Sequence, residues 1–149
     1  MKLATSRKRL MRDYGKLYHR MGNVPLELCW YCNHTRQTLD HCPPISCLET
    51  LDIEKFTADG GKFLLIPSCS DCNHYLNAAR LGFPYERLLY LERRYTKLTD
   101  KHFVNWTKEE IAELGYNLKD MIYAKDRLMR DLIRKLHCIQ HNALKVPID

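Results

Sequence analysis

The segments CWYC (residues 29–32), LDHCPP (39–44) and GGKFLLIPSCSDCNHYLN (60–77) decide how this chain folds. Two Cys-x-x-Cys pairs enclose an Asp-His pair. Two residues between thiols let one turn direct both sulfurs at one metal ion, and two such turns complete a tetrahedral site. We therefore expect one zinc ion on Cys29, Cys32, Cys69 and Cys72. Four sulfur ligands leave no open coordination position, so this zinc would be structural.

The cysteine count supports a metal site over a disulfide framework. The chain has seven cysteines, an odd number, and no apolar export signal follows its basic N-terminus. Four unrelated buried thiols would be the alternative, and the paired spacing disfavours it. Cys42, Cys47 and Cys138 lie outside the two pairs, and we expect them to be small buried apolar residues.

Length and composition predict one globular domain covering residues 1–149. The chain is 45% hydrophobic, which is typical of a folded protein. No apolar run approaches the roughly 20 residues that a membrane span needs. With no signal peptide in the sequence, we expect a cytoplasmic protein without a membrane partner.

The positive charge is concentrated at the N-terminus. The net charge is +6, and residues 1–20 hold seven basic residues against Asp13 alone, which leaves 17 residues of each sign in the remainder. A basic segment on an otherwise neutral chain predicts contact with phosphate. The residues that we expect to make it are Arg7, Lys8, Arg9 and Arg12. A solvated face of a surface helix explains the charges equally well.

Hydrophobic periodicity predicts a mostly helical α+β fold. Apolar residues spaced three and four apart predict a basic amphipathic helix over residues 1–22. A strand over 35–40 would carry Asp40 and His41, and a second over 63–66 would end at Pro67. Further helices are expected from 69 to about 82, over 85–98, over 107–115 with a capping box, and over 117–138. The last is long enough to pair with a copy of itself or with a larger protein.

The order of these features resembles the HNH endonuclease family, in the subtype with two zinc knuckles. The resemblance covers about residues 27–80 and depends on a short set of positions: Cys29, Cys32, Asp40-His41, Pro44, Gly60-Gly61, Cys69, Cys72 and Asn73. It implies a zinc-stabilised ββα-metal core, similar to a treble clef. The N-terminal helix and the helices of residues 85–140 would pack around that core.

The resemblance also implies a chemistry, namely metal-dependent hydrolysis of phosphodiester bonds in DNA. By this analogy His41 is the general base, and Asp40 and Asn73 hold Mg²⁺ or Mn²⁺, which prefer oxygen ligands. His74 follows Asn73 and would be a further ligand or a phosphate contact, and Asn77 one turn later would face the same side. Family habit suggests a bacterial or phage setting.

One position departs from the family pattern. The family's middle Asn, which holds the imidazole, would fall at Leu64. Either a backbone carbonyl near residues 59–61 replaces it, or the site is weakened. The second option makes the chain a catalytically weak or inactive zinc module that binds DNA or a protein. A regulatory zinc protein whose basic helix binds an acidic partner is a third hypothesis.

Overall fold

The computed structural model describes residues 2–77, 79–102 and 106–145. Three predicted segments, the helices over 1–22 and 69–82 and the helical region 85–140, include residues outside the described ranges, namely 1, 78 and 103–105. Its α+β class confirms the sequence prediction in outline. None of the described helices is long and apolar enough to cross a bilayer. The elements follow one another in this order: α1 (Lys2–Tyr14), η1 (Gly15–Leu17), β1 (His19–Arg20), β2 (Thr38–Cys42), η2 (Ile45–Cys47), α2 (Ile53–Ala58), β3 (Leu64–Ser68), α3 (Ser70–Leu76), α4 (Pro84–His102), α5 (Lys108–Ala112) and α6 (Tyr116–Lys145).

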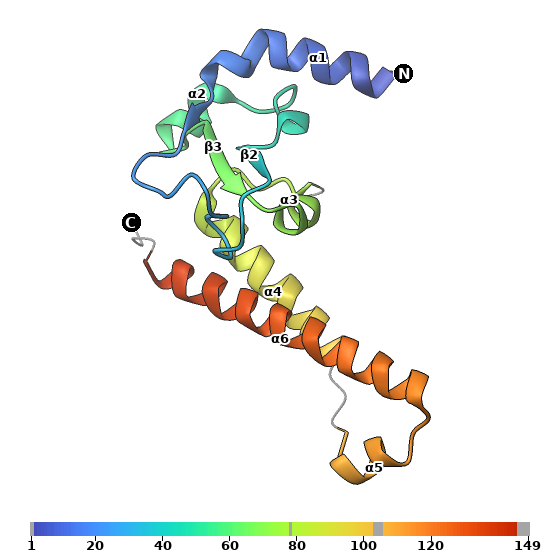
Figure 1. Cartoon of the computed structure of the whole chain (residues 1–149). Coiled ribbons are helices and arrows are strands. Elements are labelled where there is room, and N and C mark those ends of the chain that lie inside the picture. Colours follow the sequence, from blue (N-terminus) through green and yellow to red (C-terminus); the bar gives the residue numbers. More distant parts are fainter. Residues whose placement is uncertain (1, 78, 103–105, 146–149) are drawn as a thin grey trace.

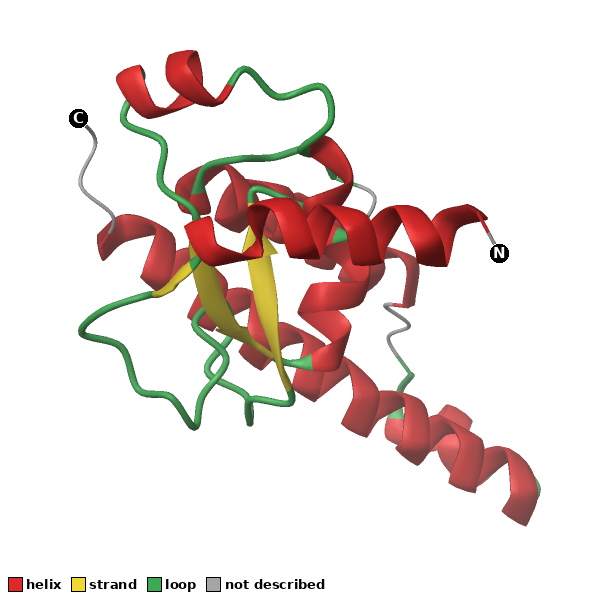
Figure 2. Ribbon diagram, turned by 90° about the horizontal axis from the view of Figure 1, so that it is seen from above, coloured by secondary structure: helices red, strands yellow, loops and turns green. Residues whose placement is uncertain are grey.

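A small sheet lies between two layers of helix (Figures 1 and 2). Its strand order is β1-β3-β2, so β3 is central and β2 is an edge strand. Strand β2 runs antiparallel to β3, and β1 runs parallel to it. Helix α1 crosses one face, while α4 and α6 pack side by side against the other (Figure 1).

Each face of the sheet has its own apolar cluster, because successive side chains of a strand point to opposite faces. Ile66 joins the larger cluster, which includes the four predicted zinc ligands and residues of α4 and α6. Phe63 and Leu65 pack instead against the smaller cluster beneath α1. The buried members of that smaller cluster are Leu10, Tyr18, Ile45 and Leu48.

The N-terminal helix is shorter than the sequence predicts. Helix α1 ends at Tyr14, where Gly15 begins a 3₁₀ turn, and the chain then enters strand β1. The prediction of one helix over 1–22 is therefore wrong in its second half. Tyr18 is only 7% exposed, and backbone bonds from His19 to Phe63 and from Met21 to Leu65 pull the chain onto the sheet. Tertiary contacts of this kind override local helix propensity.

The strands lie a few residues later than predicted. Residues 28–35 form a short hairpin closed by a Leu28–Thr35 bridge, so β2 starts at Thr38 and not at residue 35. Strand β3 continues through Pro67, which was expected to end it. The N and C=O of a strand residue point to the same side. For Pro67 this is the side on which β1 lies, but β1 pairs only with Leu64 and Leu65 and does not extend as far as Pro67. The Pro67 carbonyl accepts a bond from the Trp30 N–H there (2.8 Å), so the missing proline N–H interrupts no ladder.

The later helices exist, with different ends. Helix α3 stops at Leu76, whereas α4 and α6 extend beyond the predicted ranges. The capping box at α5 is confirmed, with Thr107 and Glu110 exchanging side chain to backbone bonds of 2.9 and 3.2 Å. The half of α6 away from the sheet exposes large apolar side chains. These are Tyr116, Leu118, Met121, Tyr123 and Leu128.

The turn before β3 depends on a glycine that has no room for a side chain. A methyl group added at Gly61 would lie 2.5 Å from the buried ring of Phe56. Overpacking of this kind strains a core. We expect Gly61→Ala to lower the free energy of unfolding by about 1–3 kcal/mol in urea denaturation.

Gly22→Ala is the matched control, since a methyl group at Gly22 meets nothing within 4 Å. Its free energy of unfolding should change by less than about 1 kcal/mol. Equal losses in the two variants would contradict the packing at Phe56.

Candidate functional site

The four paired cysteines converge on one point. Their sulfur atoms all lie within 4.8 Å of one another, and all four side chains are buried. The Cys32 and Cys69 sulfurs are 3.7 Å apart, too far for a disulfide. Zn–S bonds of about 2.3 Å in a tetrahedron place sulfurs about 3.8 Å apart. The site can therefore hold a metal ion and is compatible with structural zinc. Within the described ranges this is the one such group of His, Cys, Asp or Glu.

Local turns direct the sulfurs toward the common point in both zinc knuckles, the first formed by Cys29 and Cys32 and the second by Cys69 and Cys72. In the first, the Cys29 carbonyl accepts from the Asn33 N–H (2.9 Å), and Asn33 adopts a left-handed φ of 61°. In the second, Cys69 caps α3 and its sulfur accepts from the Cys72 N–H (3.4 Å). Hydrogen bonds from the neighbouring thiols, Cys29 first, lower the pKa of Cys69. Both turns thus hold sulfur in the arrangement that a metal ion needs.

Helix α4 supplies an outer contact to the thiol site. The buried Tyr95 hydroxyl lies 3.4 Å from the Cys72 sulfur. A hydroxyl that donates to a ligating sulfur orients that ligand and offsets part of its charge. Tyr31, the aromatic residue next to Cys32, is fully buried in the same apolar cluster as the four thiols.

Helix α6 clamps both knuckles from outside. Asn142 donates to the carbonyls of Trp30 (2.9 Å) and Tyr31 (3.1 Å) in the first knuckle. Lys135, only 4% exposed, donates to Asp71 beside the second (2.8 Å). Although burial lowers the pKa of Lys135, its bond to Asp71 raises that pKa above the ordinary value. The ammonium group therefore stays charged and keeps its ion pair with Asp71.

The three remaining cysteines differ from one another. Cys42 is fully buried and donates to the Gly82 carbonyl (3.2 Å), as expected of a small core residue. Burial raises the pKa of Cys42 to about 12, so it remains a thiol. Cys47 and Cys138 are only half-buried, so the prediction that they are core residues is wrong. Both lie on helices whose sides are partly open to solvent.

A second site lies at the free edge of β2, in a cavity of about 280 Å³. Asp40 and His41 face opposite sides of the sheet, and they meet at this edge because β2 has no further neighbour. Helix α3 contributes Asn73, its C-cap is the second lining amide, Asn77, and helix α1 contributes Arg7. The cavity therefore brings together the three residues that the HNH resemblance implies. Its other lining residues are Thr38, Leu39, Pro44, Ile45, Ser46, Leu76 and Arg87.

Asp40 is held in a buried ion pair. Its Oδ2 accepts from the Arg87 guanidinium at 2.5 Å and from the Tyr31 hydroxyl at 2.6 Å. The two charged side chains are 7% and 1% exposed. Among the described residues no hydrogen bond reaches Oδ1, so that oxygen is the one available to a ligand in the cavity.

Arg87 is the residue of this cavity that sequence reasoning missed. It lies on α4 four residues before the buried Leu91 and eight before the buried Tyr95, so a charge on this apolar stripe was the available signal. Burial lowers the pKa of Arg87, but the neighbouring Tyr31 and Asp40 raise it by more, and the guanidinium remains charged.

His41 is half-buried and its imidazole packs against Tyr18. The ring centroids are 4.9 Å apart in an edge-on arrangement, and the Tyr18 hydroxyl is anchored on the Pro43 carbonyl (2.5 Å). Burial first, and then the charges of Arg7 and Arg87, lower the pKa of His41. The neutral imidazole, which can accept a proton, is therefore favoured at neutral pH.

The expected backbone substitute for the middle Asn is not found among the described residues. Among the described residues the one side-chain hydrogen bond at His41 is made to its backbone carbonyl by Arg87, so no carbonyl of residues 59–61 is bonded to the imidazole. Leu64 lies opposite Cys42 on β3, one residue away from the histidine. The ring of Tyr18 holds the imidazole by packing instead.

The predicted basic residues of α1 separate into different environments. Arg7 lines the cavity, whereas Arg9 pairs with Glu49 and Arg12 pairs with Asp13 on the surface. Lys8 is exposed, and the structure assigns it no ion pair among the described residues. His74 is exposed and stacks edge-on with Tyr75, outside the cavity lining, whereas Asn77 lies in it.

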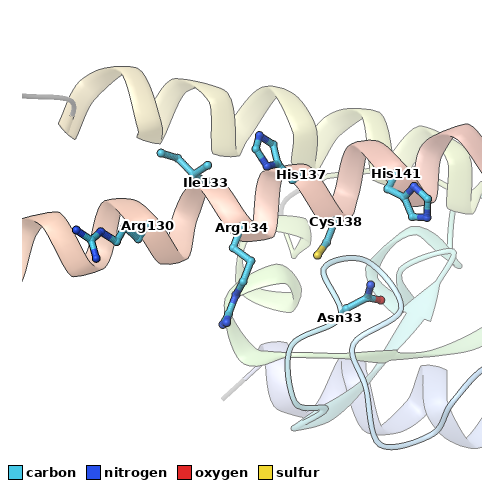
Figure 3. A pocket seen from close by; sticks show the side chains of 7 residues that line it. All are labelled: Asn33, Arg130, Ile133, Arg134, His137, Cys138 and His141. Carbon is cyan, nitrogen blue, oxygen red and sulfur yellow. The ribbon is translucent and has the colours of Figure 1, made fainter.

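A groove along α6 gathers further polar residues (Figure 3). It has a volume of about 420 Å³ and is lined by Asn33, Arg130, Ile133, Arg134, His137, Cys138 and His141. The two imidazoles and the thiol do not converge (Figure 3), so no metal site forms. Asp126 and Asp131 pair with the two arginines and offset much of their charge.

Comparisons of the chain with family models, with curated proteins and with solved structures found no match.

The four-thiol site yields a stability prediction. Metal binding to a site that closes distant segments contributes directly to folding. We expect about one zinc per chain by elemental analysis, and both chelation and Cys32→Ser should lower the melting temperature by about 10 °C or more. Cys138→Ser, at a half-buried cysteine outside the site, is the control and should keep its zinc. Full metal-free stability would contradict a structural ion.

Proposed function

We propose that this protein is a divalent-metal-dependent DNA endonuclease or nickase of the HNH type. One observation supports the proposal above the others. Asp40, His41, Asn73 and Arg7 come from three separate elements and line a single cavity of about 280 Å³. A carboxylate, a neutral imidazole, an amide and a guanidinium are the groups that metal-assisted phosphodiester hydrolysis uses.

The donor atoms suit a hard divalent cation. Asp40 offers Oδ1, since Oδ2 is occupied by Arg87 and Tyr31, and Asn73 offers its amide oxygen. Mg²⁺ and Mn²⁺ prefer such oxygen ligands and usually keep several waters. Because Arg87 already neutralises Asp40, we expect weak metal binding, with DNA phosphate completing the coordination. The bound ion would offset charge on the scissile phosphate and on the leaving oxygen.

The reaction then divides among residues of the chain. His41 accepts a proton from water at an imidazole nitrogen, and the water oxygen forms the new bond to phosphorus. The bond from phosphorus to the 3′-oxygen breaks, and that oxygen takes a proton from solvent. The products carry 5′-phosphate and 3′-hydroxyl ends. Arg7 binds a non-bridging oxygen of the same phosphate.

The expected partner is DNA, in the cytoplasm of a bacterium or of a phage-infected host. Arg7 extends from α1 into the cavity, which gives the basic helix a specific task beyond general attraction to phosphate. The exposed apolar side of α6 would serve a protein partner or a second copy of the chain. None of the helices in the described part of the chain carries an ordered set of base-reading residues, so we propose phosphate contact as the main source of affinity.

A catalytically weak or inactive zinc module that binds DNA or a protein is the second candidate function. The apolar Leu64 and the engagement of Asp40 with Arg87 both favour it. The two candidates differ in one property, which is metal-dependent strand cleavage.

Nicking of supercoiled plasmid tests the proposal. With Mg²⁺ or Mn²⁺ we expect relaxed circles to accumulate, and His41→Ala should lower the rate by about 100-fold or more, because a positioned general base contributes 10²–10⁴-fold. His137→Ala removes an exposed histidine far along α6 and should cleave like the wild type. Equal rates in wild type and His41→Ala would reject His41 as the base. DNA binding without cleavage under any divalent ion would favour the second candidate.

DNA affinity tests the role of Arg7. Arg7→Ala should weaken binding and reduce the slope of log K against log salt by about one, as expected for the loss of one phosphate contact. Arg12→Ala is the matched control on the same helix, since this side chain is exposed and paired with Asp13. Equal effects of the two substitutions would mean that α1 attracts DNA only through its total charge.

A further inference from the structure

We propose that Arg87 is a positioning residue that holds Asp40 and His41 in their working orientation from behind the sheet. This inference rests on the function proposed above. The sequence pattern that resembles HNH enzymes ends near residue 80, so Arg87 lies outside it. Arg87 also lies 47 residues from Asp40 along the chain and meets it only through tertiary packing.

The guanidinium of Arg87 binds three acceptors at once. Its Nη1 donates to Asp40 Oδ2 (2.5 Å), its Nη2 to the His41 carbonyl (2.9 Å) and its Nε to the Leu81 carbonyl (3.0 Å). The planar fork of arginine presents donors in fixed directions. One side chain therefore fixes a carboxylate, the backbone of the adjacent histidine and the segment that leads into α4.

This arrangement decides which oxygen of Asp40 faces the cavity. Arg87 and Tyr31 both donate to Oδ2, which restrains rotation of the carboxylate and leaves Oδ1 as its oxygen without a hydrogen bond among the described residues. The carbonyl contact also restrains His41, whose position no Asn at residue 64 can secure. Outer contacts that orient ligating groups commonly change metal affinity or activity 10–100-fold.

Stability alone does not account for the pair. A buried ion pair often contributes no more than well-packed apolar side chains of similar volume, because both charges must be desolvated. The pair also lies at the wall of the cavity and not in the centre of the core, since both residues line it. Orientation of the Asp40 carboxylate explains why the Arg87 guanidinium is held at the cavity wall.

Arg87→Lys tests the geometry while it keeps the charge. A lysine ammonium is a point donor that cannot reproduce the planar fork to all three acceptors. At saturating Mn²⁺ we expect the nicking rate to fall about 10-fold or more, and the Mn²⁺ concentration for half-maximal rate to rise several-fold. Zinc content and secondary structure by circular dichroism should remain those of the wild type.

Leu88→Ala is the matched control. Leu88 is the next residue of α4 and is fully buried, so its truncation destabilises the same helix without touching Asp40. At a temperature below the melting temperatures of Leu88→Ala and of the wild type, the variant should keep the Mn²⁺ dependence of the wild type. A wild-type rate and Mn²⁺ dependence in Arg87→Lys, or the same loss in Leu88→Ala, would overturn the positioning role. If Arg87→Lys loses zinc, Arg87→Gln replaces it, because glutamine also lacks the guanidinium fork, and an unchanged Mn²⁺ dependence there would likewise overturn the role.

Mn²⁺ binding separates failure of this inference from failure of the proposed function. Electron paramagnetic resonance measures the concentration of free Mn²⁺ in a solution of the zinc-loaded protein, so that Mn²⁺ binding is determined independently of DNA cleavage. If the wild type binds Mn²⁺ but does not nick DNA, the proposed function fails, and weaker binding by Arg87→Lys still supports positioning. If both proteins bind Mn²⁺ equally, the positioning role fails. If the wild type neither binds Mn²⁺ nor nicks DNA, both proposals fail.

Discussion

The closure of four thiols around one point is the constraint on which the rest of this structure depends. Cys29 and Cys32 must meet Cys69 and Cys72 across 36 intervening residues, and their sulfurs come within 4.8 Å. That closure brings the first knuckle against the end of β3, where the Trp30 N–H bonds the Pro67 carbonyl. It also fixes where β2 can begin, and so the register that sets Asp40 opposite Ile66 and His41 opposite Leu65.

Register turns this closure into a site. Because strand side chains alternate, Asp40 points toward α4 and His41 toward Tyr18 beneath α1. Two adjacent residues are therefore supported by opposite layers of the molecule. They reach a common cavity only because β2 is an edge strand, where α3 can bring Asn73 alongside. A further strand beside β2 would have filled this cavity.

Two ion pairs of the described residues, each with a buried cation, serve different ends. Lys135 and Asp71 join α6 to the second knuckle and stabilise the thiol site from outside. Arg87 and Asp40 join α4 to β2 beside the cavity. Both cations are almost completely buried, so each is retained only because its partner and further acceptors compensate the loss of water. Helices α4 and α6 thus form one scaffold that supports both sites.

The features that the sequence determined alone are those that depend on short spacings. Two residues between thiols specify a metal knuckle, and Thr107 with Glu110 specifies a capping box, because both patterns act within a single turn. The α+β class and the membership of Asp40, His41 and Asn73 in one cavity also followed from the pattern. Tertiary structure decided the rest. It ended α1 at Tyr14 and placed residues 19–20 in a strand, selected Arg7 from among the basic residues of α1, and paired Arg87 with Asp40. The physical reason is that these outcomes join residues tens of positions apart, and a contact of that kind depends on how whole elements pack and not on local propensity.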